Sequence, residues 1–357
     1  MNCKQCGFKE ELTGPLINGY CTPCIQGEED ANRMEVVSQE EDAMRWLDRD
    51  LSVEPTWWSP KLTKFGGPIM PGLTLVCARP CNGKTTLFAN QIIHAANDPQ
   101  QKVLCFPLET SPGKFRITLA AIEEGLNPGL VRRREWESLP PGAKQRVVKK
   151  MGEQSARWGD RLRMVGDDRI TQRELLTHLK DAHDQKYTLV ALDHLHEVAW
   201  TDDPDKLTAE MTEGMHKIRV LLREYESTEY PLRLLAACQL KRPTGYDALE
   251  EYMVPPLSAI KQSGAAEEVA AYVYMLYRAL KDGVTEGDMK LVRGGQMPVS
   301  EVADIGTTKL NCAKHRDDGG LKGQEIKMYI QEDRLLDEKP THGWLPVAPA
   351  NTHGEVI

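Results

Sequence analysis

A strand-like segment and a glycine-containing loop adjoin in the sequence Leu73-Thr-Leu-Val-Cys-Ala78-Arg-Pro-Cys-Asn-Gly-Lys-Thr-Thr86. Residues 73–78 form a short apolar run that is typical of a buried strand, and residues 84–96 favour a helix. The loop between them matches the phosphate-loop pattern G-x-x-x-x-G-K-[ST] except at its first position, which is Ala78. Because the backbone N–H groups of such a loop surround phosphates at a helix N-terminus, the stretch predicts a nucleotide-binding site.

The loop supplies the first candidate site residues. Lys84 is expected to reach the β and γ phosphates of the nucleotide, and the Thr85 hydroxyl is expected to hold Mg²⁺. A chance turn before a helix is the alternative, but a strand followed by Gly-Lys-Thr-Thr and a helix favours the nucleotide site. The candidate nucleotide-binding residues of the loop are Ala78, Arg79, Pro80, Cys81, Asn82, Gly83, Lys84, Thr85 and Thr86.

Two carboxylates lie at or just beyond the ends of later apolar segments. Glu109 follows the apolar residues 103–106, and Asp193 ends the apolar run 189–193. Ligands of α/β sheets bind outside the carboxyl ends of the strands, where both acids are expected. There Glu109 could deprotonate a water that attacks the γ-phosphate, and Asp193 could position Mg²⁺. Either acid alone would be an ordinary strand-end residue, and only the combination with the phosphate loop favours catalytic roles.

Strand-like and helix-like segments alternate along the chain from residue 71 onwards. This alternation predicts an α/β domain with a mainly parallel sheet and flanking helices. Strands are expected at residues 73–78, 103–106, 162–165, 188–193, 232–238, 269–276 and 309–314, and helices at 84–96, 113–124, 171–185 and 207–225. Residues 137–142 and 281–307 are expected to be surface excursions, the second an insertion with little core.

Four of the nine cysteines are concentrated near the amino terminus, as Cys3-x-x-Cys6 and Cys21-x-x-Cys24. Two such pairs have the spacing of a zinc site, and four thiolates form a closed tetrahedral site for Zn²⁺. We therefore expect a small structural zinc ribbon before the α/β domain, with metal binding supplying most of its folding energy. Two disulfides or four free thiols are the alternatives.

Composition and charge limit the function classes further. The net charge of −8 argues against non-specific coating of duplex nucleic acid, although it does not exclude a narrow basic channel. No apolar run approaches the ~20 residues of a membrane span, and the amino terminus lacks the apolar core of a secretory signal. A cytoplasmic protein without membrane contact is therefore expected. The expected organisation is a zinc ribbon in residues 1–30, a linker with a short helix in 31–60, the α/β domain in 61–340 and a tail in 341–357.

Several further segments match one known family in its order. Besides the phosphate loop, they are Val103-Leu-Cys-Phe-Pro-Leu-Glu-Thr-Ser111, Leu189-Val-Ala-Leu-Asp-His-Leu195, Leu235-Ala-Ala-Cys-Gln-Leu-Lys-Arg-Pro243, Leu257-Ser-Ala-Ile-Lys-Gln-Ser-Gly-Ala-Ala266 with Tyr277-Arg278, and Ala313-Lys-His-Arg-Asp-Asp-Gly-Gly320. Over about residues 63–336, the chain resembles the DnaB-type hexameric replicative helicases and the helicase half of phage primase–helicases. Those proteins are RecA-like motors, so the resemblance implies a RecA-like fold.

The resemblance implies a role for each matching position in the nucleotide site. Lys84 and Thr85 would bind phosphate and Mg²⁺. Glu109 would be the catalytic base, and Asp193 would be the magnesium partner. Gln239 would sense the γ-phosphate.

The resemblance also implies contacts beyond a single chain's own phosphates. Lys314 and Arg316 would reach the nucleotide of a neighbouring subunit, as an arginine finger and its companion. Arg278 would lie near the base or the ribose. The residues implied to contact the DNA backbone, for which a solvated surface is the alternative, are Lys241, Arg242 and Lys261.

An ATP-dependent, ring-forming DNA helicase that moves on single-stranded DNA during replication is the function that the resemblance implies. It would use ATP, Mg²⁺ and Zn²⁺ and form a homo-oligomer, a hexameric ring, with a polymerase, primase or loader as a further partner. The chain departs from the family because the helical amino-terminal domain of DnaB and room for a primase core are both missing. This suggests a phage or plasmid origin and the host cytoplasm. A RadA-like recombination ATPase and an ATP-binding zinc adaptor without unwinding activity are the alternatives.

Overall fold

The computed structural model describes Met44 and residues 54–80, 82–166, 169–226, 228–241, 249–260, 264–317, 319–331 and 334–336. The chain divides into two units, Met1–Asp50 and Leu51–Ile357, and the fold below is that of the second. Several predictions fall outside the described residues: the zinc ribbon, the tail at 341–357 and, apart from Met44 and residues 54–60, the linker with a short helix at 31–60. The same holds for the candidate site residues Cys81, Arg242 and Lys261, besides the four cysteines of the zinc ribbon.

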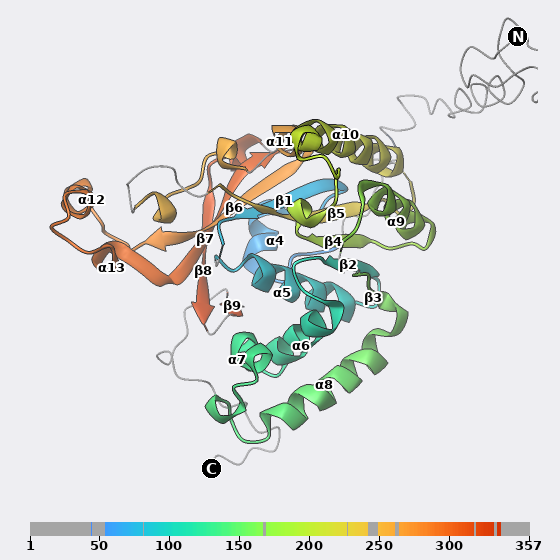
Figure 1. Ribbon diagram of the computed structural model, residues 1–357, viewed down its shortest axis with the longest axis horizontal. Helices are drawn as coiled ribbons and strands as arrows, with labels where there is room; N and C mark the ends of the chain where they lie inside the picture. Colours follow the sequence, from blue (N-terminus) through green and yellow to red (C-terminus); the bar gives the residue numbers. More distant parts are fainter. Residues whose placement is uncertain are drawn as a thin grey trace, which may run out of the picture. The chain divides into compact units, whose positions relative to one another are not determined.

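A mixed sheet of nine strands forms the centre of the described part of the chain (Figure 1). The strands are β1 (Gly72–Ala78), β2 (Val103–Pro107), β3 (Leu162–Met164), β4 (Leu189–Asp193), β5 (Arg233–Gln239), β6 (Tyr272–Leu280), β7 (Ala303–His315), β8 (Glu325–Gln331) and β9 (Arg334–Leu336). Their order is β3-β2-β4-β5-β1-β6-β7-β8-β9, in which β3 to β6 are parallel and β6 to β9 pair antiparallel. The predicted α/β class with a mainly parallel sheet is therefore confirmed.

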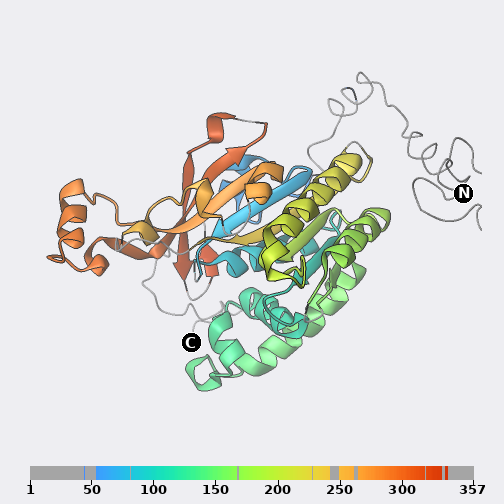
Figure 2. The same ribbon diagram turned by 45° about the horizontal axis from the view of Figure 1, so that its top comes forward.

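Helices cover both faces of the parallel part of this sheet (Figures 1 and 2). The helices of the described residues are α4 (Pro60–Gly66), α5 (Lys84–Asn97), α6 (Pro112–Glu123), α7 (Pro128–Arg133), α8 (Ala143–Trp158), α9 (Gln172–Asp184), α10 (Leu207–Glu226), α11 (Gly264–Val269), α12 (Glu286–Arg293) and α13 (Val299–Val302). One apolar cluster joins the sheet to α5, α6 and α8, and a second joins its other face to α9, α10 and α11.

The apolar sequence of β1 explains why it lies between two layers of helices. All seven of its residues are buried. Side chains alternate between the faces of a strand, and here Leu75 and Cys77 belong to the cluster with α9 and α10, whereas Val76 and Ala78 belong to the cluster with α5. A strand that is covered on both faces needs a nearly continuous apolar run, which is the pattern of residues 73–78 apart from Thr74.

Local signals in the sequence fix where two of the helices begin. At the start of α9, Thr171 and Glu174 form a capping box: the Glu174 N–H donates to the Thr171 hydroxyl (3.2 Å), and the Thr171 N–H donates to the Glu174 carboxylate (2.8 Å). At α6, the Ser111 hydroxyl accepts from the Lys114 N–H, and Pro112 occupies the first turn.

The insertion between β6 and β7 differs from its prediction. Instead of a surface excursion with little core, it contains α12, α13 and the first residues of β7. Val292 and Val302 of the insertion are buried together with Leu249, which precedes β6, so the insertion packs around a small core that it shares with that segment. A capping box of Thr285 and Asp288 opens α12.

No helix among the described residues is both long and apolar enough to cross a lipid bilayer.

Candidate nucleotide-binding site

The carboxyl ends of four adjacent parallel strands bring the predicted site residues to one edge of the sheet. The order β2-β4-β5-β1 places these strands side by side. Ala78 is in register with Gln239 across β1 and β5, and Pro107 is in register with Asp193 across β2 and β4. Strand direction therefore gathers residues that lie far apart in the sequence, at the edge where α/β sheets bind ligands.

The phosphate loop connects β1 to the first turn of α5. Gly83 caps this helix with φ = 87° and ψ = 14°, a left-handed conformation that glycine adopts without the steric cost paid by other residues. Lys84 is the first residue of the helix and is only 9% exposed. The loop thus presents a buried ammonium group and the N-terminus of a 14-residue helix, and both favour an anion.

Asp193 lies within the electrostatic range of three other predicted site residues. Its carboxylate accepts a hydrogen bond from the Thr85 side chain and interacts with the charges of Lys84 and Glu109. Burial raises the pKa of Asp193 to about 6, against the lowering effect of Lys84 and Thr85, and the nearby Glu109 adds to the rise. The structure therefore brings together the acid, the lysine and the hydroxyl that the sequence predicted as one site.

Asp193 Oδ1, Asn82 Nδ2 and Asn82 Oδ1 are buried at this site without a hydrogen-bond partner among the described residues. A buried polar group in this state costs about 1–3 kcal/mol unless a ligand or water satisfies it. A carboxylate oxygen and a hydroxyl are the ligands that Mg²⁺ prefers, and the amide, the ammonium and the helix N-terminus suit phosphate oxygens. The donor set therefore fits a nucleotide phosphate with its magnesium ion.

Glu109 is tied to the end of β4 through its backbone. Its N–H donates to the carbonyl oxygen of Asp193 at 3.1 Å, while its side chain is exposed to solvent. This backbone hydrogen bond holds the Cα atom of Glu109, from which its side chain extends, close to the buried Asp193. The carboxylate remains free to meet water, as a general base requires.

Gln239, the last residue of β5, has a neighbour that sequence analysis missed. Its N–H donates to Nδ1 of His196 at 3.4 Å, and His196 lies in the turn that follows β4. The ring of His196 also meets the ring of His194 edge to face, with centroids 5.7 Å apart. No local signal predicts this contact, because it depends on β4 and β5 being adjacent in the sheet.

The family of the chain follows from this geometry together with the sequence. Residues 63–331 match the model of the DnaB-like helicase C-terminal domain. The chain belongs to this family. The replicative DNA helicase DnaB of Helicobacter pylori is 26% identical over 264 residues, which are 71% of this chain and 50% of that protein. The matched part of the chain thus spans about half the length of this relative.

Solved structures share the fold of this DnaB-like domain. A DnaB-like replicative helicase, described with its interactions with primase, superposes with a TM-score of 0.61 at 15% identity over 89% of this chain and 72% of the other. A second structure, of an isolated ATPase domain, gives a TM-score of 0.58 at 15% identity, over 89% of this chain and 97% of the other. The likeness shows the fold, and the expected RecA-like architecture is confirmed.

Two predicted residues of the DnaB-like domain lie apart from its own phosphate loop. Lys314 is paired with Val273, three residues before Leu276, which lies beside Ala78. The Lys314 ammonium donates to the backbone carbonyls of Glu267 (2.7 Å) and Glu268 (3.1 Å), and burial lowers its pKa. Arg316 is exposed. The structure does not bring this pair into the site of the same chain.

Arg278 and Lys241 extend the edge that carries the phosphate loop. Arg278 follows Leu276 by two residues along β6, so it lies beyond the end of β1. Lys241, two residues after Gln239, is exposed, and its N–H donates to the Ala259 carbonyl at 2.8 Å. Lys241 is the one described member of the three predicted DNA contacts.

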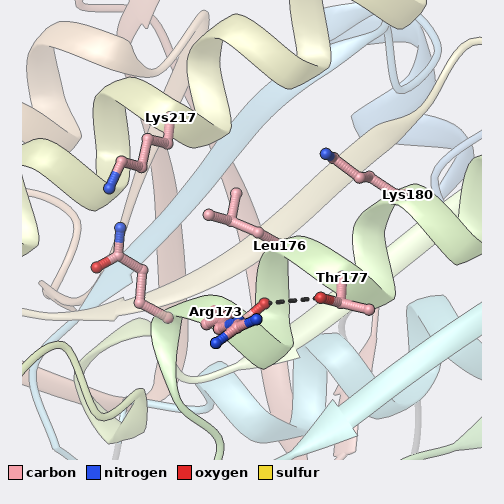
Figure 3. Close-up of a pocket in the computed structure, with 6 residues that line it drawn as sticks. Arg173, Leu176, Thr177, Lys180 and Lys217 are labelled. Carbon is pink, nitrogen blue, oxygen red and sulfur yellow. Dashed lines mark hydrogen bonds between the residues drawn. The ribbon is translucent and has the colours of Figure 1, made fainter. Parts of the chain in front are cut away.

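A separate pocket lies between α9 and α10 of the DnaB-like domain and contains no predicted site residue (Figure 3). Its volume is about 430 Å³, and its lining residues are Gln172, Arg173, Leu176, Thr177, Lys180 and Lys217. The Thr177 hydroxyl donates to the Arg173 carbonyl at 3.0 Å, as the dashed line in Figure 3 shows, and Lys217 is paired with Glu213 at 2.6 Å. These contacts within α9 and within α10 therefore use some of the polar groups that line the pocket.

Replacing Asp193 by Asn should stabilise the nucleotide-free DnaB-like domain at neutral pH. A carboxyl whose pKa rises from 3.8 to about 6 on folding ionises first in the unfolded chain. Its contribution to the free energy of unfolding therefore falls as pH rises from about 4 to about 6 and is constant above that. We expect the variant to gain roughly 2–3 kcal/mol above pH 7 and to lose this gain near pH 4. Denaturant titration at both pH values measures it, and equal gains at the two would contradict the account.

Proposed function

We propose that the chain is an ATP-driven, ring-forming DNA helicase that translocates on single-stranded DNA during replication. The observation that carries this proposal is the buried Asp193 carboxylate at the strand ends of a DnaB-like domain. This carboxylate is hydrogen-bonded to Thr85 and interacts electrostatically with Lys84 and Glu109. Membership of that family favours the helicase over a RadA-like recombination ATPase and over an adaptor without unwinding activity.

Each side chain of the site has a distinct proposed task. Lys84 neutralises charge on the β and γ phosphates, and Thr85 with Asp193 holds the magnesium ion, which supplies further charge neutralisation when bound. Glu109 takes the proton of the attacking water, because its exposed carboxylate starts beside Asp193. Gln239 and the rest of the phosphate loop orient the nucleotide.

A ring is proposed because the site is incomplete within one chain. Lys314 and Arg316 lie away from their own phosphate loop, and a finger acting on a neighbour's nucleotide would make hydrolysis depend on the oligomer. Arg278 is proposed to lie near the base or ribose. In the ring, Lys241, Arg242 and Lys261 would contact the backbone of single-stranded DNA, with primase, a loader or a polymerase as further partners.

The proposed domain organisation is a zinc ribbon in residues 1–30, a linker in 31–60, the ATPase domain in 61–340 and a tail in 341–357. The zinc ligands would be Cys3, Cys6, Cys21 and Cys24, on the strength of their CxxC spacing alone. The described residues contain no group of three His, Cys, Asp or Glu side chains that could hold a metal ion.

Replacing Cys3 and Cys6 by Ser should release about one zinc ion per chain, because a four-thiolate site holds one metal. ATP hydrolysis should survive, since the phosphate loop lies far along the chain. Metal analysis of protein purified under reducing conditions measures the zinc content, with Cys105→Ser, at a buried strand position, as the matched control. A wild-type protein without zinc would refute the zinc ribbon.

The Lys84→Ala variant tests the nucleotide site directly. Removing the ammonium should weaken binding of a non-hydrolysable ATP analogue about 10- to 100-fold, as expected for the loss of a charge-assisted hydrogen bond. Calorimetry measures the dissociation constant, and circular dichroism checks the fold. Lys64→Ala, at the end of α4, serves as the lysine control. Wild-type affinity in the folded Lys84→Ala variant would refute the site and the proposed function with it.

A further inference from the structure

The first two residues of the phosphate loop contact the part of the chain that follows strand β5. The carbonyl oxygen of Ala78 accepts a hydrogen bond from the Leu240 N–H at 3.1 Å. The guanidinium of Arg79 donates to the carbonyl oxygen of Glu250, which is 171 residues away in the sequence. Arg79 is 6% exposed, and its contact with Glu250 is partly buried. A loop expected to bind phosphate thus also holds a distant backbone segment.

That segment, residues 249–260, is fixed at both of its ends. Leu249 is fully buried against Val292 and Val302. At the other end, Ile260 forms a β-bridge with Leu240, and the Ala259 carbonyl accepts from the N–H of Lys241. The end of the segment is therefore hydrogen-bonded to Lys241, the residue that is proposed to contact DNA. A displacement of Glu250 can therefore reach Lys241 through residues 251–259 of the same segment.

We propose that Arg79 is a positioning residue that couples the occupancy of the phosphate loop to the 249–260 segment, and thereby sets how strongly single-stranded DNA stimulates ATP hydrolysis. The inference rests on the proposed function. A guanidinium held by a backbone carbonyl in a partly buried contact transmits a displacement of the loop better than an exposed, flexible side chain would. The coupling is reciprocal: if nucleotide binding changes the segment's affinity for DNA, DNA changes the affinity for nucleotide by the same factor.

The experiment compares full-length wild type, Arg79→Ala and Arg79→Lys in two measurements. One is the ratio of ATP hydrolysis rates with and without a deoxythymidine oligonucleotide. The other is amide hydrogen exchange in peptides that contain residues 249–253, with and without a non-hydrolysable ATP analogue. The Arg79→Ala variant should lose about tenfold in the stimulation ratio, within the usual range of coupling between sites. Its 249–253 amides should no longer respond to the analogue, and Arg79→Lys should recover part of both effects.

Two controls separate coupling from simple destabilisation. Arg132→Ala removes an exposed arginine of α7 and should leave both measurements at wild-type values. Leu249→Ala loosens the segment without touching the phosphate loop, and Leu126→Ala makes a comparable cavity in the separate cluster of α6 to α8. We expect only Leu249→Ala of this pair to lower the stimulation ratio, so the proposal stays testable even if Arg79→Ala fails to fold.

The outcomes distinguish this proposal from the one on which it rests. A wild type that binds no ATP analogue refutes the proposed function. A wild type that binds ATP and is stimulated by DNA, while Arg79→Ala and Leu249→Ala keep the wild-type ratio, refutes the coupling alone. An unchanged ratio with an altered thermal midpoint assigns Arg79 a purely structural role and also refutes it.

Discussion

The Arg316→Ala variant should bind ATP with wild-type affinity and hydrolyse it about 10³- to 10⁵-fold more slowly, the effect of removing an arginine finger where one acts on a phosphoryl group. Arg316 is exposed and lies just beyond β7, and the neighbouring Lys314 is held by the end of α11 rather than by the phosphate loop. The loss should therefore appear in the hydrolysis rate and not in the dissociation constant, which steady-state kinetics and analogue binding measure separately. Arg293→Ala, at the end of α12, is the matched control.

Mixing Arg316→Ala with Glu109→Gln should restore part of the activity if the finger acts between subunits. Where an Arg316→Ala chain supplies the phosphate loop and a Glu109→Gln chain supplies the finger, every catalytic group is present. Neither variant forms such an interface alone. If mixed oligomers form without any rescue, the finger acts within its own chain or Arg316 has a structural role, and the proposed ring chemistry fails.

The Glu109→Gln variant should bind ATP normally and hydrolyse it about 10²- to 10⁴-fold more slowly, because a glutamine cannot accept the proton of the attacking water. The backbone bond from Glu109 to Asp193 is unaffected by the substitution, so the fold and the magnesium partner should persist. Single-turnover hydrolysis and analogue binding measure the two effects, with Glu135→Gln, an exposed acid on the α7 side of the sheet, as the control.

Unchanged turnover in Glu109→Gln would place the base elsewhere. The structure gives Glu197 as the next residue to replace, because it follows Asp193 by four positions and its carboxylate lies 3.7 Å from the ring of His194. A loss of activity in Glu197→Gln but not in Glu109→Gln would correct the assignment while leaving the nucleotide site intact.

The parts of the fold that sequence predicted are those whose signals are local. A short apolar run marked β1 as a buried strand, and Gly83 followed by Lys84 marked the turn into α5. The sequence predicted that Glu109 and Asp193 lie at one edge of the sheet, because parallel strands end at the same edge. It carried no signal for the hydrogen bond between their backbones. The order of the motifs along the chain was sufficient for that prediction, because each motif follows a strand of the parallel part of the sheet.

Other elements were missed although a signal was present. The helix α8 carries buried residues at Ala143, Val147, Gln154 and Trp158, a helical spacing obscured by its many charges. In β8, Ile326 and Met328 alternate with polar residues, the pattern of a strand with one covered face. The contacts of Arg79 with Glu250 and of His196 with Gln239 had no local signal at all, because each joins segments that only the completed sheet brings together.

Unwinding of a forked DNA duplex by the purified full-length chain tests the central claim most directly. The substrate should carry a free 5′ tail, and a D-loop of the same sequence should be offered in parallel, with ATP and Mg²⁺ in one reaction and a non-hydrolysable analogue in the other. The account predicts strand separation of the fork only with ATP, none by Lys84→Ala, and a preference for the fork over the D-loop. Oligomers that hydrolyse ATP without separating the fork, or that act on the D-loop instead, would contradict it.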